Sequence, residues 1–147
     1  MPAIFARLSV KDSSSALVED MPLRILLVED NPDLRREVSE YLIRRQHDVV
    51  AVEGSVEARQ VLTSVAAERF NVVLCDLNLQ DGDGIDLYVE LGGLHPACSW
   101  LLMSGSPDFL RLAAARQSAP HLPPCTLVAK PVSLRELGKL VTAGSLP

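Results

Sequence analysis

The sequence has no cluster of basic residues and no long hydrophobic run. Its 147 residues carry a formal net charge of −5, with 14 lysines and arginines against 19 aspartates and glutamates. Binding to a DNA duplex requires clustered lysine and arginine to neutralise phosphates, so direct nucleic-acid binding is not expected. A membrane-spanning helix needs about 20 consecutive apolar residues, and the apolar stretches here are far shorter, so no membrane association is expected.

Cysteine and histidine are also scarce. The three cysteines are Cys75, Cys98 and Cys125. They form no CxxC pair and lie in or beside expected strands, which favours small buried side chains in a reducing compartment and hence a cytoplasmic protein. The three histidines are His47, His95 and His121. They fall in connecting segments without metal-ligand spacing, so we expect ordinary surface histidines.

The length of the chain fits one domain with one core, and 48% apolar with 22% charged residues is an ordinary globular composition. Residues 1–22 have no continuous apolar core of signal-peptide length. We therefore expect a flexible N-terminal leader over residues 1–22, a single domain over 23–143 and a short tail over 144–147. No second domain is expected, because the chain ends shortly after the last expected helix.

Apolar runs and helical patterns alternate from Leu23 onward. The runs predict five strands, at residues 25–28, 49–52, 72–76, 100–103 and 126–129. Apolar residues at helical spacing predict five helices, over about residues 32–45, 58–65, 87–91, 107–119 and 134–141. Asn31 and Pro32 suit the cap and first position of the first helix. Residues 81–84 (DGDG) favour turns and positive φ and predict a loop, and the glycine pair at 92–93 should end the third helix.

Five strands that alternate with five helices predict an α/β fold, a doubly wound five-stranded parallel sheet with helices on both faces. The strands are continuous apolar runs, as expected when both faces are covered. Right-handed crossovers leave few topologies open, and among them we expect the strand order 2-1-3-4-5. In that order a crevice opens between the C-terminal ends of strands 1 and 3, where open α/β sheets place their ligands.

Polar residues follow four of these strands at that edge: Glu29 and Asp30, then Asp76, Ser104 and Lys130. Three carboxylates in one place repel one another unless a cation binds, and Mg²⁺ prefers such oxygen ligands. Asp76 is the candidate nucleophile, because a carboxylate can take a phosphoryl group and form an acyl phosphate. Lys130 would offset the charge of the transferred oxygens, and the Ser104 hydroxyl can bond to one of them.

Each residue alone has an ordinary interpretation as a helix cap, a turn residue or a solvated charge, and the combination is what indicates a site. Calcium binding of the EF-hand type is not supported, because registers that begin at Asp76 or Asp81 lack the glycine required at the sixth position. A phosphatase with an aspartyl nucleophile would need a second carboxylate at position 78, where the chain has Asn78.

These motifs resemble the receiver domain of two-component response regulators. The matching segments are residues 26–31 (LLVEDN), 73–77 (VLCDL), 102–105 (LMSG) and 129–131 (AKP). The resemblance extends over residues 23–141 and implies that Asp76 accepts a phosphoryl group from a sensor histidine kinase or a histidine phosphotransfer protein. It implies that Asp30 and Asp76 ligate Mg²⁺, with Glu29 acting largely through water and the backbone carbonyl of Asn78 as a further ligand.

The resemblance also implies how the site is used. Ser104 and Lys130 should engage the phosphoryl group and report it, and the side chains of Asn78 and Ser106 should flank the water that hydrolyses the acyl phosphate. The protein would not be an enzyme beyond its own phosphoryl transfer and autodephosphorylation. It would act on a downstream target protein by phosphorylation-dependent contact, through the fourth helix, fifth strand and fifth helix.

Three positions depart from the family pattern. Leu127 stands where the family usually has an aromatic residue, so the usual coupling of a hydroxyl shift to an aromatic ring is altered or absent. Gln80 stands where the family commonly has proline, so a more mobile loop is expected after Asp76. Residues 120–124 lack the family's usual glycine-containing turn. These departures leave a second hypothesis open, a constitutive binding module of the same fold without a phosphorylation cycle.

Overall fold

The computed structural model describes residues 21–64 and 70–144. The leader and tail that we predict over residues 1–22 and 144–147 therefore lie almost entirely outside the described residues. Within the described ranges no helix combines the length and the apolar character needed to cross a bilayer.

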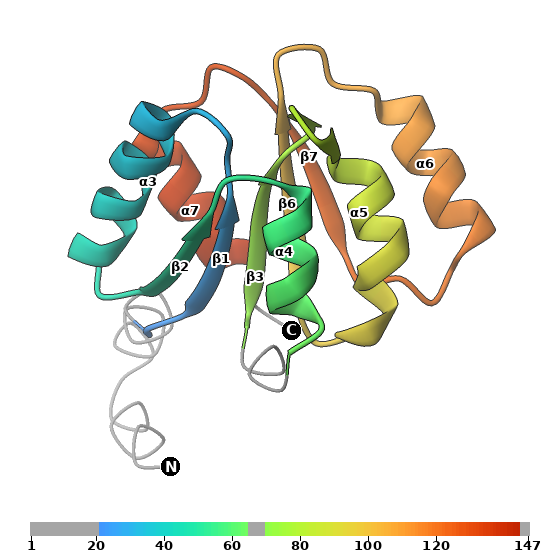
Figure 1. The fold of residues 1–147 in the computed structure, drawn as a ribbon, viewed down its shortest axis with the longest axis horizontal. Coiled ribbons are helices and arrows are strands. Elements are labelled where there is room, and N and C mark those ends of the chain that lie inside the picture. The colour runs from blue at the N-terminus through green and yellow to red at the C-terminus, as the bar shows by residue number, and fades with distance from the viewer. Residues whose placement is uncertain (1–20, 65–69, 145–147) are drawn as a thin grey trace, which may run out of the picture.

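A five-stranded parallel sheet forms the centre of the protein (Figure 1). Its strands are β1 (Arg24–Val28), β2 (Asp48–Val52), β3 (Val72–Asp76), β6 (Ser99–Ser104) and β7 (Cys125–Ala129). All neighbouring strands pair in parallel, in the order β2-β1-β3-β6-β7. Numbered along the chain, these five strands have the order 2-1-3-4-5, so the predicted fold class is confirmed.

Five α-helices of the described residues cover the sheet on both faces (Figure 1). They are α3 (Pro32–Arg44), α4 (Ser55–Leu62), α5 (Gly84–Leu91), α6 (Phe109–Ser118) and α7 (Leu134–Gly144). Helices α3 and α7 supply core residues to one face, and α4, α5 and α6 supply them to the other. The helices thus form the outer layers of a three-layer arrangement.

Strand β1 illustrates why its apolar run is continuous. Successive side chains of a strand point to opposite faces. Ile25 and Leu27 join the core under α3 and α7, whereas Leu26 and Val28 join the core under α4, α5 and α6. All four side chains are fully buried, because a parallel sheet with helices on both faces has no solvated side.

Local capping explains where several helices begin. The Asn31 side chain accepts a hydrogen bond from Leu34 N at 3.0 Å and Pro32 occupies the first turn of α3, as the sequence predicts. Asp83 caps α5 through Ile85 N and Asp86 N. Each cap satisfies amide groups that have no partner inside their helix.

The segment 81–84 differs from the prediction of a loop. Gly82–Asp83 forms the short strand β5, which pairs antiparallel with β4 (Asn78–Leu79), and α5 begins at Gly84. The positive φ angles expected for this segment were also wrong, because among the described residues no glycine has positive φ. The glycine pair ends the third helix as predicted, because α5 ends at Leu91 with Gly92 as its C-cap, and a 3₁₀ turn over Gly92–Leu94 follows.

The cysteines and histidines agree only in part with the predictions. Cys75 and Cys98 are buried as expected, whereas Cys125 is only half-buried. Burial raises the pKa of each thiol. The prediction of surface histidines was wrong for His47, which is 6% exposed. Its Nδ1 accepts a hydrogen bond from Leu23 N at 3.0 Å, where β1 and β2 begin side by side.

We predict that His47 makes the stability of the fold depend on pH. Burial, together with the charge of Arg45, lowers the pKa of His47 in the folded protein. The unfolded chain then binds more protons, so the free energy of unfolding should fall as pH drops below the ordinary histidine pKa of about 6.5. Urea unfolding between pH 7.5 and 5.5 measures this loss. His47→Asn keeps an acceptor for Leu23 N without titrating, and the loss should be smaller in that variant; equal losses would contradict the assignment.

Candidate functional site

The ends of β1 and β3 bring the predicted acidic residues together. Val28 and Cys75 are partners in the sheet register, so Glu29 and Asp76 follow them at the same edge. Oxygen atoms of Glu29, Asp30 and Asp76 all lie within 4.8 Å of one another. The three carboxylates that the sequence places in two distant segments therefore form one cluster at the crevice between strands 1 and 3.

Glu29 is the most deeply buried member of this cluster, at 1% exposure. Its Oε2 accepts a hydrogen bond from Asn31 N at 3.1 Å, while its Oε1 has no hydrogen-bond donor among the described residues. Burial raises the pKa of the Glu29 carboxyl, the Asn31 amide opposes that rise, and the charge of Asp76 adds to it. One oxygen of the Glu29 carboxylate is thus buried without a hydrogen-bond donor among the described residues.

Lys130 supplies the positive charge of the cluster. Its Nζ lies 3.2 Å from Asp76 Oδ2 and 3.6 Å from Glu29 Oε1. The backbone N–H of Lys130 donates to Ser104 O at 2.7 Å, which ties Lys130 to the end of β6. The Lys130–Pro131 peptide bond is cis. One ammonium group cannot neutralise three carboxylates, so the cluster keeps an excess of negative charge.

Ser104 ends β6 beside this cluster and is fully buried. Its Oγ accepts hydrogen bonds from Asn78 Nδ2 at 3.3 Å and from Ser106 N at 3.0 Å. Neither bond uses the proton of the hydroxyl. The backbone of Asn78 also approaches Asp76, since its N–H donates to Asp76 Oδ1 at 3.4 Å. All the site residues predicted from the sequence therefore lie along one edge of the sheet.

The donor set fits a hard divalent cation. Mg²⁺ takes oxygen ligands in an octahedral arrangement and keeps several waters. The cluster offers carboxylate oxygens from three residues, and the donorless Glu29 Oε1 is the kind of buried atom that a metal-bound water would satisfy. No nitrogen or sulfur ligand belongs to this cluster, so the chemistry favours magnesium over zinc or copper.

The turn after Asp76 is anchored to the start of α4, a contact that was not predicted from the sequence. Asp81 Oδ1 accepts from Ser55 N at 2.8 Å and its Oδ2 accepts from Val56 N at 3.1 Å. Gly54, the N-cap of α4, has no side chain to do this. Asp81 therefore caps a helix that begins 26 residues earlier, and its pKa is lowered by the Ser55 and Val56 amides. The one indication of this contact in the sequence was Gly54, because a glycine at the N-cap position has no side chain with which to cap its own helix.

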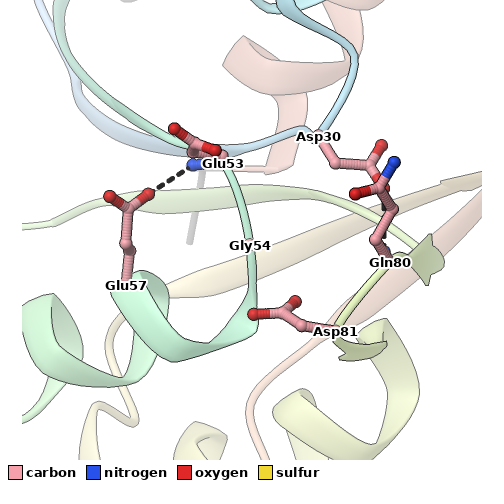
Figure 2. Close-up of a pocket in the computed structure, with 6 residues that line it drawn as sticks. All are labelled: Asp30, Glu53, Gly54, Glu57, Gln80 and Asp81. Atoms are coloured by element: carbon pink, nitrogen blue, oxygen red, sulfur yellow. Dashed lines mark hydrogen bonds between the residues drawn. The ribbon is translucent and has the colours of Figure 1, made fainter.

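A pocket of about 360 Å³ lies in this region beside the acid cluster, and Figure 2 shows the residues that line it. Its lining residues are Asp30, Glu53, Gly54, Glu57, Gln80 and Asp81. Three of its carboxylates already accept backbone amides, since Glu57 accepts from Glu53 N, Asp30 from Gln80 N and Asp81 from the start of α4. The bonds of Asp30 and Asp81 tie the turn to the end of β1 and to the start of α4.

The start of α5 approaches the end of β3 closely. A Cβ atom at Gly84 would lie 2.9 Å from Asp76 O and 3.0 Å from Leu77 Cα, so only glycine allows this packing. A bidentate ion pair from Arg111 of α6 to Asp83, at 2.7 and 2.8 Å, then joins α6 to the cap of α5. Burial would raise the pKa of Asp83, but its bonds to Arg111 and to the backbone lower it.

Leu127 occupies the place where the family usually has an aromatic side chain. It is 8% exposed and lies opposite Leu102 in the sheet. It belongs to the core under α4, α5 and α6, together with an edge-to-face pair of Tyr88 and Trp100 whose ring centroids are 5.4 Å apart. An aliphatic side chain thus completes the core here.

Comparison with known proteins agrees with the fold. A family model described as "Response regulator receiver domain" matches residues 25–142. The chain is 34% identical over 128 residues to the response regulator protein FleR of Pseudomonas aeruginosa, covering 86% of this chain and 25% of FleR. It is 33% identical over 119 residues to the sensor protein TorS of Escherichia coli, covering 81% of this chain and 12% of TorS.

Solved structures give the same fold. A receiver domain protein from Clostridium thermocellum has a TM-score of 0.71 at 18% identity, over 84% of this chain and 94% of that one. The receiver domain of the hybrid histidine kinase CckA has a TM-score of 0.67 at 20% identity, over 84% and 99%. The sheet, its switch point and the acid cluster define a receiver-type α/β domain. The chain belongs to the response regulator receiver domain family and spans about a quarter of the length of FleR.

We predict that Gly54 and Asp81 are energetically coupled. A Cβ atom at position 54 would lie 2.6 Å from Asp81 Oδ1, so Gly54→Ala should displace the carboxylate and cost about 1 kcal/mol, as losing a helix cap does. In an Asp81→Ala background most of that cost should vanish. Urea unfolding of both single variants and the double variant measures the coupling. Gly105→Ala is the control, since a Cβ there meets no atom within 4 Å; additive costs at 54 and 81 would contradict the capping.

Proposed function

We propose that this receiver domain is a phosphorylatable switch of a two-component system and that Asp76 is its phosphoacceptor. The observation that carries the proposal is the position of the Asp76 carboxylate, 3.2 Å from Lys130 Nζ and inside a cluster of three acids. Asp76 is 6% exposed, at the C-terminal edge of the sheet, where a donor can reach it and bulk water is partly excluded.

Asp30 and Asp76 would hold Mg²⁺ directly, with Glu29 acting through water and the Asn78 backbone carbonyl as a further ligand. When bound, Mg²⁺ neutralises charge on the transferred phosphoryl oxygens and on the cluster itself. Glu29 suits an indirect role, because its Oε2 is already occupied by the Asn31 amide and its Oε1 faces Lys130. The cluster's excess negative charge is what favours a divalent cation.

In the transfer step, a carboxylate oxygen of Asp76 attacks the phosphorus of a phosphohistidine. The new P–O bond forms as the P–N bond breaks, and the imidazole leaves with the electron pair and takes up a proton. Lys130 lies beside the reacting carboxylate and can pair with a phosphoryl oxygen once the acyl phosphate has formed. Little covalent chemistry is needed from the protein beyond positioning and charge stabilisation.

Ser104 would sense the phosphoryl group. Its hydroxyl proton is not used in the bonds from Asn78 and Ser106, so it can donate to a phosphoryl oxygen. Moving that hydroxyl alters its bond to Ser106 N and hence the segment that leads to α6. The side chains of Asn78 and Ser106, both exposed, would flank the water that hydrolyses the acyl phosphate and set its lifetime.

The partner that donates phosphate would be a sensor histidine kinase or a histidine phosphotransfer protein, and the output a phosphorylation-dependent contact with a target protein. Matches to a response regulator and to a sensor protein support such a system. We propose no enzymatic activity beyond phosphorylation and autodephosphorylation of the domain, no direct contact with nucleic acid or membrane, and a cytoplasmic location, in keeping with the acidic net charge of −5.

We predict that acetyl phosphate with Mg²⁺ adds one phosphoryl group to the protein and that Asp76→Asn abolishes the labelling. The amide cannot act as the nucleophile, although its shape matches the acid. Intact-mass spectrometry measures the labelling, and Asp86→Asn, at an exposed acid of α5, is the control that should label normally. Labelling that persists in Asp76→Asn would move the acceptor elsewhere, and an unlabelled native chain beside a labelled control receiver would overturn the proposal.

Leu127 is buried where the family usually has an aromatic residue that takes part in switching. This favours a second candidate, a constitutive binding module of the same fold. In that case a captured partner would bind equally well with and without Mg²⁺–beryllofluoride, a mimic of the phosphoryl group. A switch predicts beryllofluoride-dependent binding instead. The convergence of the acids and Lys130 at one edge supports the switch.

A further inference from the structure

The turn after Asp76 contains a hydrogen bond that the family's usual proline could not make. The backbone N–H of Gln80 donates to Asp30 Oδ2 at 2.8 Å, across 50 residues of sequence. Proline has no N–H. This contact therefore depends on the departure from the family pattern at position 80, and its acceptor is one of the three clustered carboxylates.

The Gln80 amide belongs to a turn that is anchored independently. Gln80 and Asp81 connect β4 to β5, and the Asp81 carboxylate and carbonyl both bond to Ser55 at the start of α4. Figure 2 shows the Gln80 and Asp30 side chains near each other, with Asp81 directed toward the Gly54 segment. An N–H held by such a turn has a fixed direction, so it can orient the carboxylate it binds.

The Asp30 side chain otherwise lies at the surface edge of the cluster. It is half-buried, unlike Glu29 and Asp76. A carboxylate has two oxygens with about four acceptor positions, so a hydrogen bond to Oδ2 still leaves Oδ1 free to ligate a cation. Ligating carboxylates are commonly held by a second hydrogen-bonded group, and removing that group weakens metal binding by about 10- to 100-fold.

We propose that the Gln80 backbone amide is a positioning group that orients Asp30 for Mg²⁺ binding. The inference rests on the proposed function, because it assigns the amide a role in the magnesium site of that function. It also accounts for the absence of proline at position 80. The hydrogen bond from Gln80 N–H to Asp30, together with the bonds of Asp81 to Ser55, fixes the turn that a proline ring would otherwise make rigid.

The test compares Gln80→Pro with Gln80→Ala. Both remove the Gln80 side chain, but only proline removes the N–H. Proline is compatible with the backbone here, because Gln80 does not have positive φ and the preceding Leu79 is in a strand. Isothermal titration with MgCl₂ should show about 10-fold weaker binding for Gln80→Pro and a dissociation constant within about twofold of the native value for Gln80→Ala.

Two further measurements separate a positioning role from general damage. The free energy of unfolding without Mg²⁺ should be nearly the same for both variants, while only the proline variant loses Mg²⁺ affinity. In the native protein, the Gln80 amide should exchange slowly with deuterium by NMR. Free exchange of that amide, or equal Mg²⁺ affinity in the two variants, would overturn the inference while leaving the proposed function intact; a native chain that binds no Mg²⁺ would overturn both.

Discussion

Electrostatic repulsion among three acids at the ends of two neighbouring strands is the constraint on which the rest of the site depends. Glu29, Asp30 and Asp76 lie within 4.8 Å of one another, and Glu29 is almost completely buried. Lys130 offsets only part of their charge. An arrangement of this kind is unfavourable by itself, and a bound divalent cation relieves it. The sheet maintains it because β1 and β3 are covered on both faces.

The turn that follows Asp76 joins the acid cluster to the rest of the domain. Asp81 caps α4, the Gln80 amide holds Asp30, and Asp83 caps α5 while it binds Arg111 of α6. These contacts belong to consecutive short segments of chain. The turn after Asp76 is therefore linked by hydrogen bonds to α4, α5 and α6. Leu127 completes the core beside it without the aromatic side chain usual in the family.

Much of the site could be predicted from the sequence, because parallel strands carry their following residues to a common edge. That rule placed Glu29, Asp76 and Ser104 together, and the structure agrees. The loop expected at residues 81–84 was wrong because turn propensity is local, whereas the pairing of Gly82–Asp83 with Asn78–Leu79 and the bonds to α4 come from tertiary contacts. His47 was misplaced for the same reason, since its burial depends on β1 beginning beside β2.

Local sequence patterns were sufficient to predict the alternation of strands and helices and the chemical groups at the sheet edge, because periodicity and buried apolar runs are encoded by nearby residues. Which backbone amide binds which carboxylate depends instead on tertiary contacts. The Gln80–Asp30 and Asp81–Ser55 contacts join positions 50 and 26 residues apart. Hydrogen bonds of this kind require a specific distance and direction between distant segments, and no local pattern in the chain specifies either.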